Sequence, residues 1–163
     1  MKVAFTGHRP HKLGGYNDTK NRSCTFYAII SRLLRTLDSV TIISGMALGV
    51  DTWAAKLALW NKYPLHVYIP FKGQEATWPE NSQREYRALL DYAESVIYCS
   101  TPGYSAHKMQ IRNERMVDAC DLLIAVWDGT NGGTKNCLDY AKKRKTNILL
   151  LTPSDLHKGA GAL

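Results

Sequence analysis

Six short runs of apolar and β-branched residues divide the chain at regular intervals. Each run has the length of a strand and is bounded by polar or turn-forming residues. The runs are apolar almost throughout, so we expect each strand to be buried on both faces. The predicted strands are residues 2–6, 39–44, 65–69, 95–99, 121–126 and 146–151.

Between these runs, apolar residues recur at the three- and four-residue spacing of an amphipathic helix. The five predicted stripes extend from Phe26 to Leu37, Trp53 to Trp60, Tyr86 to Leu90, Met109 to Ala119 and Leu138 to Ala141. Strand and helix therefore alternate along the whole chain. This alternation predicts an α/β fold of the Rossmann-like, doubly wound type, in which a mostly parallel sheet carries helices on both faces.

The length of 163 residues fits a single domain covering 1–163. Only the tail, 153–163, which ends in the Gly/Ala-rich stretch HKGAGAL, is expected to be loosely ordered. No apolar run approaches the roughly 18 residues of a membrane span, and no signal peptide is visible. The sequence therefore predicts a cytoplasmic protein with no membrane partner.

Cysteine usage agrees with that compartment. The four cysteines are widely spaced, form no CxxC pair and have no histidine at metal-ligand spacing. We expect reduced thiols, no metal site and no bound cofactor. The formal net charge of +7 favours anionic partners, and nucleotides and nucleic acids both qualify. Part of that charge lies in Lys142 to Lys145, which is also typical of the solvated last turn of a helix.

Parallel sheets of this type bind ligands outside the carboxyl ends of their strands. The first strand is followed by TGHRP, in which Gly7 permits close approach to the backbone while His8 and Arg9 offer hydrogen-bond donors to an anion. The first loop is therefore a candidate binding element.

The second strand is followed by SGMALGVD, which runs from Ser44 to Asp51. Gly45 and Gly49 flank a tight turn there, and the unsatisfied amides of the next helix would point back toward the sheet edge. We interpret this turn as a second anion site.

The fifth strand is followed by WDGTNGGT, in which Gly132 and Gly133 would leave bare amides at the start of a helix that Thr134 begins and caps. A glycine-rich turn also occurs merely to reverse the chain, but three at one sheet edge favour a phosphate and ribose site. Neither GxxxxGK[ST] nor GxGxxG is present, so hydrolysis of nucleoside triphosphates is not supported.

Arg112 lies between Met109 and Met116 at helical spacing, on or beside an apolar stripe. A charge in that position needs a partner. Two interpretations stay open: an arginine that reaches water from the helix edge, or a guanidinium directed at phosphate near Gly132 and Gly133.

Several longer motifs extend the pattern across nearly the whole chain. They are TGHRP, SGMALGVDTWAA (44–55), IPFKGQEATWPENSQREY (69–86), RNERMVDACDLLIAVWDG (112–129) and NGGT (131–134). Together they resemble the SLOG superfamily of Rossmann-like proteins and, within it, the YpsA-like family.

Two better-understood branches of that superfamily bear on function. SGMALGVDTWAA looks like a segment of DprA, which binds single-stranded DNA. The stretch from Arg112 to Thr134 is similar to the LOG phosphoribohydrolases, which cleave nucleoside monophosphates at the glycosidic bond. This resemblance places Arg112 at their catalytic arginine but Cys137 at their catalytic glutamate. A thiol does not replace that carboxylate.

The leading prediction is therefore a protein that binds a nucleotide or nucleotide derivative. LOG-like N-glycosidic hydrolysis and DprA-like binding of single strands are the alternatives, and a homo-oligomer is left open. Asp51 or Asp128 would bind hydroxyl groups, while Phe71 and Trp78 would enclose the base or pack in the core. The full set of candidate ligand-binding residues is Gly7, His8, Arg9, Ser44, Gly45, Gly49, Asp51, Phe71, Trp78, Arg112, Asp128, Gly132, Gly133 and Thr134.

Overall fold

A computed structural model of the chain describes residues 1–18 and 21–157. Its strands form one sheet in the order β4-β3-β2-β1-β5-β6, and every adjacent pair is parallel. The doubly wound α/β fold predicted from the sequence is thus confirmed. The strands are β1 (Lys2–Gly7), β2 (Thr41–Ser44), β3 (Leu65–Ile69), β4 (Ser95–Tyr98), β5 (Leu122–Val126) and β6 (Asn147–Leu151).

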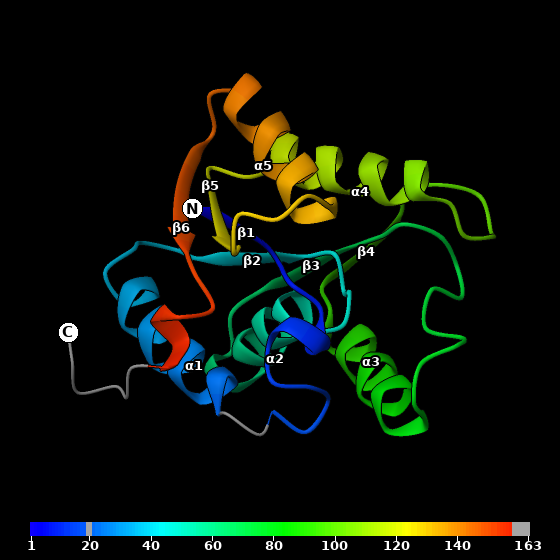
Figure 1. The fold of residues 1–163 in the computed structure, drawn as a ribbon, viewed down its shortest axis with the longest axis horizontal. Coiled ribbons are helices and arrows are strands. Elements are labelled where there is room, and N and C mark those ends of the chain that lie inside the picture. Colours follow the sequence, from blue (N-terminus) through cyan, green and yellow to red (C-terminus); the bar gives the residue numbers. More distant parts are fainter. Residues whose placement is uncertain (19–20, 158–163) are drawn as a thin grey trace.

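The helices cover both faces of the sheet (Figure 1). One face carries α1 (Arg22–Leu34), α2 (Val50–Asn61) and α3 (Glu80–Tyr92), and the other carries α4 (Ala106–Ala119) and α5 (Gly133–Lys143). Two short 3-10 helices, η1 (Pro10–Lys12) and η2 (Asp155–His157), complete the described elements. Among the described residues, no helix combines the length and the apolar character needed to span a membrane.

The core is divided into two layers by the sheet. In the central strand β1, Val3 and Phe5 face the layer under α1–α3, while Ala4 faces the layer under α4 and α5. This alternation is the two-residue period of a strand, and both sets are fully buried because helices cover both sides.

Two local expectations differ from the structure. The predicted burial of both faces is wrong for β4 and β6, which are edge strands with half-exposed residues, because each has a neighbour on one side only. Trp60, expected in the core stripe of α2, is 57% exposed and packs edge-on against Tyr27.

The described part of the C-terminal tail, residues 153–157, is packed. η2 lies against α1, and its Leu156 is fully buried. Residues 158–163 lie outside the described residues.

The strand order reverses direction between β1 and β5. The chain proceeds outward from β1 through β2 and β3 to β4, then returns through α4 to place β5 on the other side of β1. The loops after β1 and β5 therefore diverge to opposite faces of the sheet. A crevice is expected at such a switch point.

Candidate functional site

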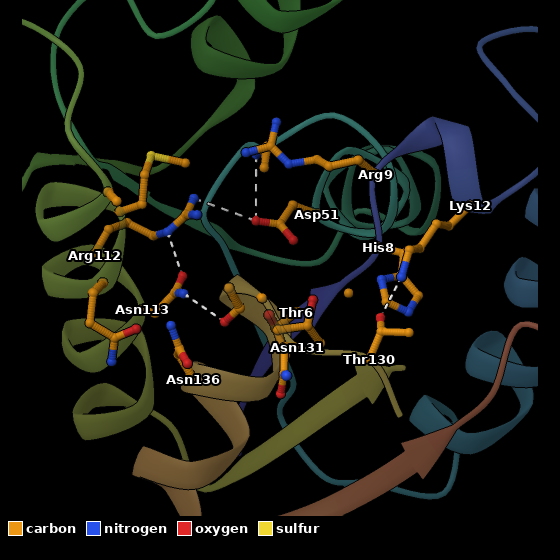
Figure 2. A pocket seen from close by; sticks show the side chains of 18 of the residues that line it. Thr6, His8, Arg9, Lys12, Asp51, Arg112, Asn113, Thr130, Asn131 and Asn136 are labelled. Atoms are coloured by element: carbon orange, nitrogen blue, oxygen red, sulfur yellow. Dashed lines mark hydrogen bonds and ion pairs between the residues drawn. The ribbon is translucent and has the colours of Figure 1, made fainter. Parts of the chain in front are cut away.

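A cavity of about 490 Å³ occupies this switch point. Its walls come from four segments: the end of β1 and η1, the start of α2, the start of α4, and the β5–α5 loop (Figure 2). Of the predicted site residues, those that line it are Gly7, His8, Arg9, Asp51, Arg112, Gly132, Gly133 and Thr134. Those that do not are Ser44, Gly45, Gly49, Phe71, Trp78 and Asp128.

The β5–α5 loop presents the most open backbone of the cavity. Helix α5 begins at Gly133 with Gly132 as its N-cap. Thr134 therefore lies inside the helix, and the prediction that it caps the helix is wrong. Gly132 has no side chain to bond the first-turn amides. A methyl group added to Gly132 or Gly133 would have no atom of another described segment within 4 Å. Both glycines are exposed and line the cavity, so the unsatisfied amides at the start of α5 are open to it.

Arg9 brings a positive charge to the same cavity. Within the described residues, its guanidinium makes neither a hydrogen bond nor an ion pair. Burial lowers the pKa of Arg9, and the negative charge of Asp51 opposes that shift. The side chain nevertheless remains a cation at neutral pH. It is a half-buried charge whose donors meet no acceptor among residues 1–18 and 21–157.

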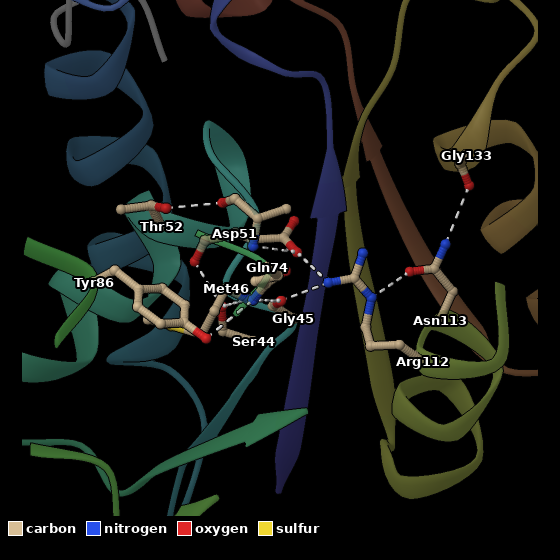
Figure 3. Close-up of polar contacts among 11 residues, drawn as sticks. Ser44, Gly45, Met46, Asp51, Thr52, Gln74, Tyr86, Arg112, Asn113 and Gly133 are labelled. Carbon is tan, nitrogen blue, oxygen red and sulfur yellow. Dashed lines mark hydrogen bonds and ion pairs between the residues drawn. The ribbon is translucent and has the colours of Figure 1, made fainter. Parts of the chain in front are cut away.

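Arg112, by contrast, has protein partners on several sides (Figure 3). Its Nη1 donates to the carbonyl of Gly45 and lies 3.5 Å from a carboxylate oxygen of Asp51, while Nε donates to Asn113 at 2.8 Å. Asn113 in turn donates to the carbonyl of Gly133 at 3.4 Å. Arg112 is only 4% exposed, so it is a buried structural cation that also forms part of the cavity wall.

Asp51 is the acidic partner in this network. Its carboxylate also accepts the amide of Ala47, within the turn that precedes α2. Burial raises the pKa of Asp51, and the positive charges of Arg112 and Arg9 act against that rise. The turn before α2, predicted to be an anion site, thus already holds an anion that belongs to the chain.

The space beside the glycines of that turn is occupied by atoms of other parts of the chain. A methyl group on Gly45 would overlap the Arg112 guanidinium, and one on Gly49 would overlap the carbonyl oxygen of His8. Gly49 also has a φ of +97°, which favours glycine. Ser44 is buried and its hydroxyl donates to the carbonyl of Asp51, so it holds the turn together. These positions shape the packing behind the cavity.

A polar bridge joins the β1 and β5 loops along one side of the cavity. Lys12 Nζ lies 3.0 Å from Asp128 and also donates to the hydroxyl of Thr130. The Asp128 amide donates to His8 Nε2 at 3.0 Å, which requires an unprotonated nitrogen. Burial lowers the pKa of His8, in agreement with that role, although an Asp128 carboxylate oxygen at 2.8 Å opposes the shift. Bonding from Thr130 and Lys12 holds the pKa of Asp128 well below its usual range.

The two predicted aromatics lie outside the cavity. Phe71 is 7% exposed and contacts the ring of Tyr104, which does line the cavity, with 6.2 Å between centroids. Trp78 packs edge-on against Tyr86 at 5.4 Å, beside the core under α3. The phenol ring in the cavity lining therefore comes from Tyr104, in the loop after β4.

Cys137 lies on the face of α5 that packs against the sheet, is fully buried and does not line the cavity. Burial raises its pKa to about 12, and a hydrogen bond with Thr6 only partly offsets this effect. The thiol is therefore neutral at physiological pH.

Sequence reasoning missed several cavity residues. His11 and Lys12 follow Arg9 after one proline, and Asn113 directly follows Arg112. Tyr104 lies in a loop at the predicted sheet edge, but nothing in its spacing separated it from other exposed tyrosines. Asn131 and Asn136 flank the glycine turn.

The parallel sheet, the helices on both faces and the polar cavity at the strand-order reversal define a Rossmann-like α/β protein. The chain belongs to the YspA SLOG family, because the YpsA family model matches residues 3–156. The resemblance stated from the motifs is thereby confirmed.

Curated relatives support the same family. The chain is 35% identical over 134 residues to the uncharacterized SPbeta prophage-derived protein YoqJ of Bacillus subtilis, covering 71% of this chain and 77% of YoqJ. It is 32% identical over 159 residues to a UPF0398 protein of Bacillus cereus (strain B4264), covering 91% and 86% of the two chains.

Among solved structures, the fold is similar to DNA processing protein A (DprA). The TM-score is 0.65 with 19% identity to DprA of Streptococcus pneumoniae, over 91% of this chain and 49% of that one. For DprA of Helicobacter pylori the TM-score is 0.64 with 20% identity, over 92% of this chain and 64% of that one. The H. pylori structure concerns a single-stranded DNA binding mode. This chain thus spans about half of the S. pneumoniae chain and somewhat less than two thirds of the H. pylori chain, and the likeness shows the fold alone.

Proposed function

We propose that this protein binds a nucleotide or nucleotide derivative in the switch-point cavity, with a phosphate group between the N-terminus of α5 and Arg9. The observation that carries the proposal is the pairing of two unsatisfied features on one cavity. Open amides at Gly132 and Gly133 lie on one wall, and on another lies the Arg9 guanidinium, which has neither a hydrogen bond nor an ion pair among the described residues.

Each feature favours an anion for a physical reason. The dipole and free amides of a helix N-terminus attract negative charge. A guanidinium removed from bulk water without a hydrogen-bond partner is unfavourable, and a phosphate can bond it with two parallel donors. Arg112 also forms part of the cavity wall, but its Nη1 and Nε already bond protein acceptors and its charge is paired with Asp51.

The first experiment is a thermal-shift screen with AMP, GMP, CMP, UMP, NAD, ADP-ribose and cyclic dinucleotides. A ligand present at 100 times its dissociation constant adds about 2.7 kcal/mol of stability. Calorimetry then compares the best ligand with Arg9→Gln and with Arg35→Gln, which removes the same charge from the exposed end of α1. Loss of affinity in the first variant alone supports the proposal, and equal affinity in both contradicts it.

Single-stranded nucleic acid is a second candidate ligand, supported by the net charge of +7 and by the fold similarity to DprA. It differs from a mononucleotide in its salt dependence. Affinity for a strand contacting several phosphates falls steeply with ionic strength, whereas a pocketed mononucleotide responds less. Titration of an oligonucleotide and of the best mononucleotide at two salt concentrations separates the two.

The enzymatic alternative has less support. Cys137, at the position that resemblance assigns to a catalytic carboxylate, is buried, neutral and outside the cavity lining. Asp51 is the acidic residue that lines the cavity, and it is engaged with Arg112. We therefore favour binding over hydrolysis, and chromatographic assay for free base from nucleoside monophosphates tests that choice.

A further inference from the structure

The cavity walls differ in chemical character. The β1 and β5 loops contribute cations and exposed amides, whereas the segment that begins α4 contributes the less polar side chains of Tyr104, Ala106 and Met109. A ligand that fills both parts needs an anionic end and an apolar end. A phosphate alone would use only one of them.

Tyr104 is largely exposed to solvent although its ring packs against Phe71. Its side chain is 76% exposed although it lines the cavity. The buried ring of Phe71 meets it at an interplanar angle of 83°, an edge-to-face contact that sets its orientation. Most of the tyrosine ring remains available for a second aromatic contact.

The backbone that carries Tyr104 is held by several hydrogen bonds. Lys108 Nζ donates to the carbonyls of Thr101, Pro102 and Gly103, each at 2.9 Å. Ser105 caps α4 by accepting the amide of Lys108 at 3.1 Å. A lysine that bonds three successive carbonyls fixes the loop, so Tyr104 is presented on an ordered segment.

We infer that Tyr104 is the stacking surface for the base of the bound nucleotide, and that the ligand therefore joins a planar aromatic ring to its phosphate. This inference rests on the function proposed above. Ala106 and Met109 would line the edge of the base, and Arg9 lies close enough for its charge and the Tyr104 phenol to interact. Stacking of this kind accepts any base, because every base has a π face.

The test compares ligands with and without a base. Calorimetry measures the affinities of AMP, GMP, CMP and UMP, with ribose 5-phosphate as the baseless probe, for the parent protein, Tyr104→Ala and Tyr104→Phe. Stacking on an aromatic side chain changes affinity by about 5-fold to 150-fold. We expect the tightest mononucleotide to exceed ribose 5-phosphate by a factor in that range in the parent and in Tyr104→Phe. Tyr104→Ala should remove most of the difference and leave ribose 5-phosphate binding unchanged.

Tyr98→Ala is the matched control, because Tyr98 is 48% exposed on the edge strand β4 and outside the cavity lining. It should bind all five probes as the parent does. Equal binding of mononucleotides and ribose 5-phosphate by the parent overturns the stacking inference but leaves phosphate binding intact. A base preference that survives Tyr104→Ala also overturns it. Failure of all five probes to bind overturns the inference, whereas the proposed function is overturned only if NAD, ADP-ribose and the cyclic dinucleotides of the thermal-shift screen also fail to bind.

Discussion

Two groups of glycines surround the cavity, and they have opposite surroundings. Gly7, Gly45 and Gly49 are pressed against other parts of the chain, and a methyl group on any of them would collide with Val50, Arg112 or the His8 carbonyl respectively. Gly132 and Gly133 have no such neighbours among the described residues. In the sequence the two groups look alike, since each follows a strand and precedes a helix.

The difference separates two uses of the same residue type. In the first group, the missing side chain lets protein segments approach one another and positions Arg112 and Asp51. In the second group, the missing side chain leaves room that protein does not fill. Substitutions in the first group should therefore act on stability, and those in the second on ligand binding.

The largest effect is expected where Gly45 makes room for Arg112. Arg112→Leu should lower the free energy of unfolding by about 3–5 kcal/mol, because it leaves the buried carboxylate of Asp51 without its ion pair. Urea denaturation followed by circular dichroism measures this. Arg115→Leu, an exposed arginine on the same helix, is the control and should change stability by less than about 1 kcal/mol. Similar losses in both would show that the Arg112 network contributes little.

The next effect concerns Gly49 itself. Gly49→Ala should lower the free energy of unfolding by about 2–4 kcal/mol, since it combines a strained positive φ with overlap of a backbone oxygen that cannot rotate away. Gly133→Ala is the matched substitution in the second group. Its stability should equal or slightly exceed that of the parent, because alanine favours the helical conformation. If both variants were equally stable, the proposed division of the glycines would be wrong.

A smaller free-energy change, read out as affinity, is expected from Gly133→Val. The added side chain would occupy the space in front of the α5 amides, so affinity for the best nucleotide should fall tenfold or more, about 1.4 kcal/mol. The melting temperature without ligand should stay close to that of the parent. Calorimetry and thermal denaturation give the two values, and unchanged affinity would move the phosphate away from α5.

The smallest effect is a pH dependence from His8, whose carbonyl fills the space beside Gly49. Burial lowers the pKa of His8 in the folded protein, so the unfolded chain binds the proton more readily. Stability from this residue is therefore present above the unfolded value of about 6.5 and is lost as pH falls below it. Urea unfolding at pH 7.5 and 5.5 should show this decrease, and His8→Gln should reduce it. An unchanged pH profile in the variant would assign the decrease to other groups.

The sequence predicted the fold well because its signal was periodic. The run 65–69 and the observed β3 coincide, and the other predicted strands differ at their ends by two residues or fewer. The edge positions of β4 and β6 were not predictable in the same way. Burial on a second face depends on which strands become neighbours, and the local pattern does not contain that information.

The site was harder to predict because glycine has no side chain to indicate its surroundings. Whether Gly45 adjoins a ligand or a guanidinium depends on the course of α4, more than 60 residues away in the chain. Thr134 was assigned as a helix cap from its residue type, but the helix begins one residue earlier at a glycine. Tyr104 became a candidate only when the structure placed it on the cavity with Phe71 behind it.

The bridge from Lys12 to Asp128 and Thr130 has a consequence for the kinetics of binding. It ties the two loops that diverge at the strand-order reversal, and the Arg112–Asn113–Gly133 connection ties the opposite side. A ligand that enters walls already joined in this way loses little free energy to ordering the protein. Association should therefore proceed in one kinetic step, with an observed rate that rises linearly with ligand concentration and no slow rearrangement after contact.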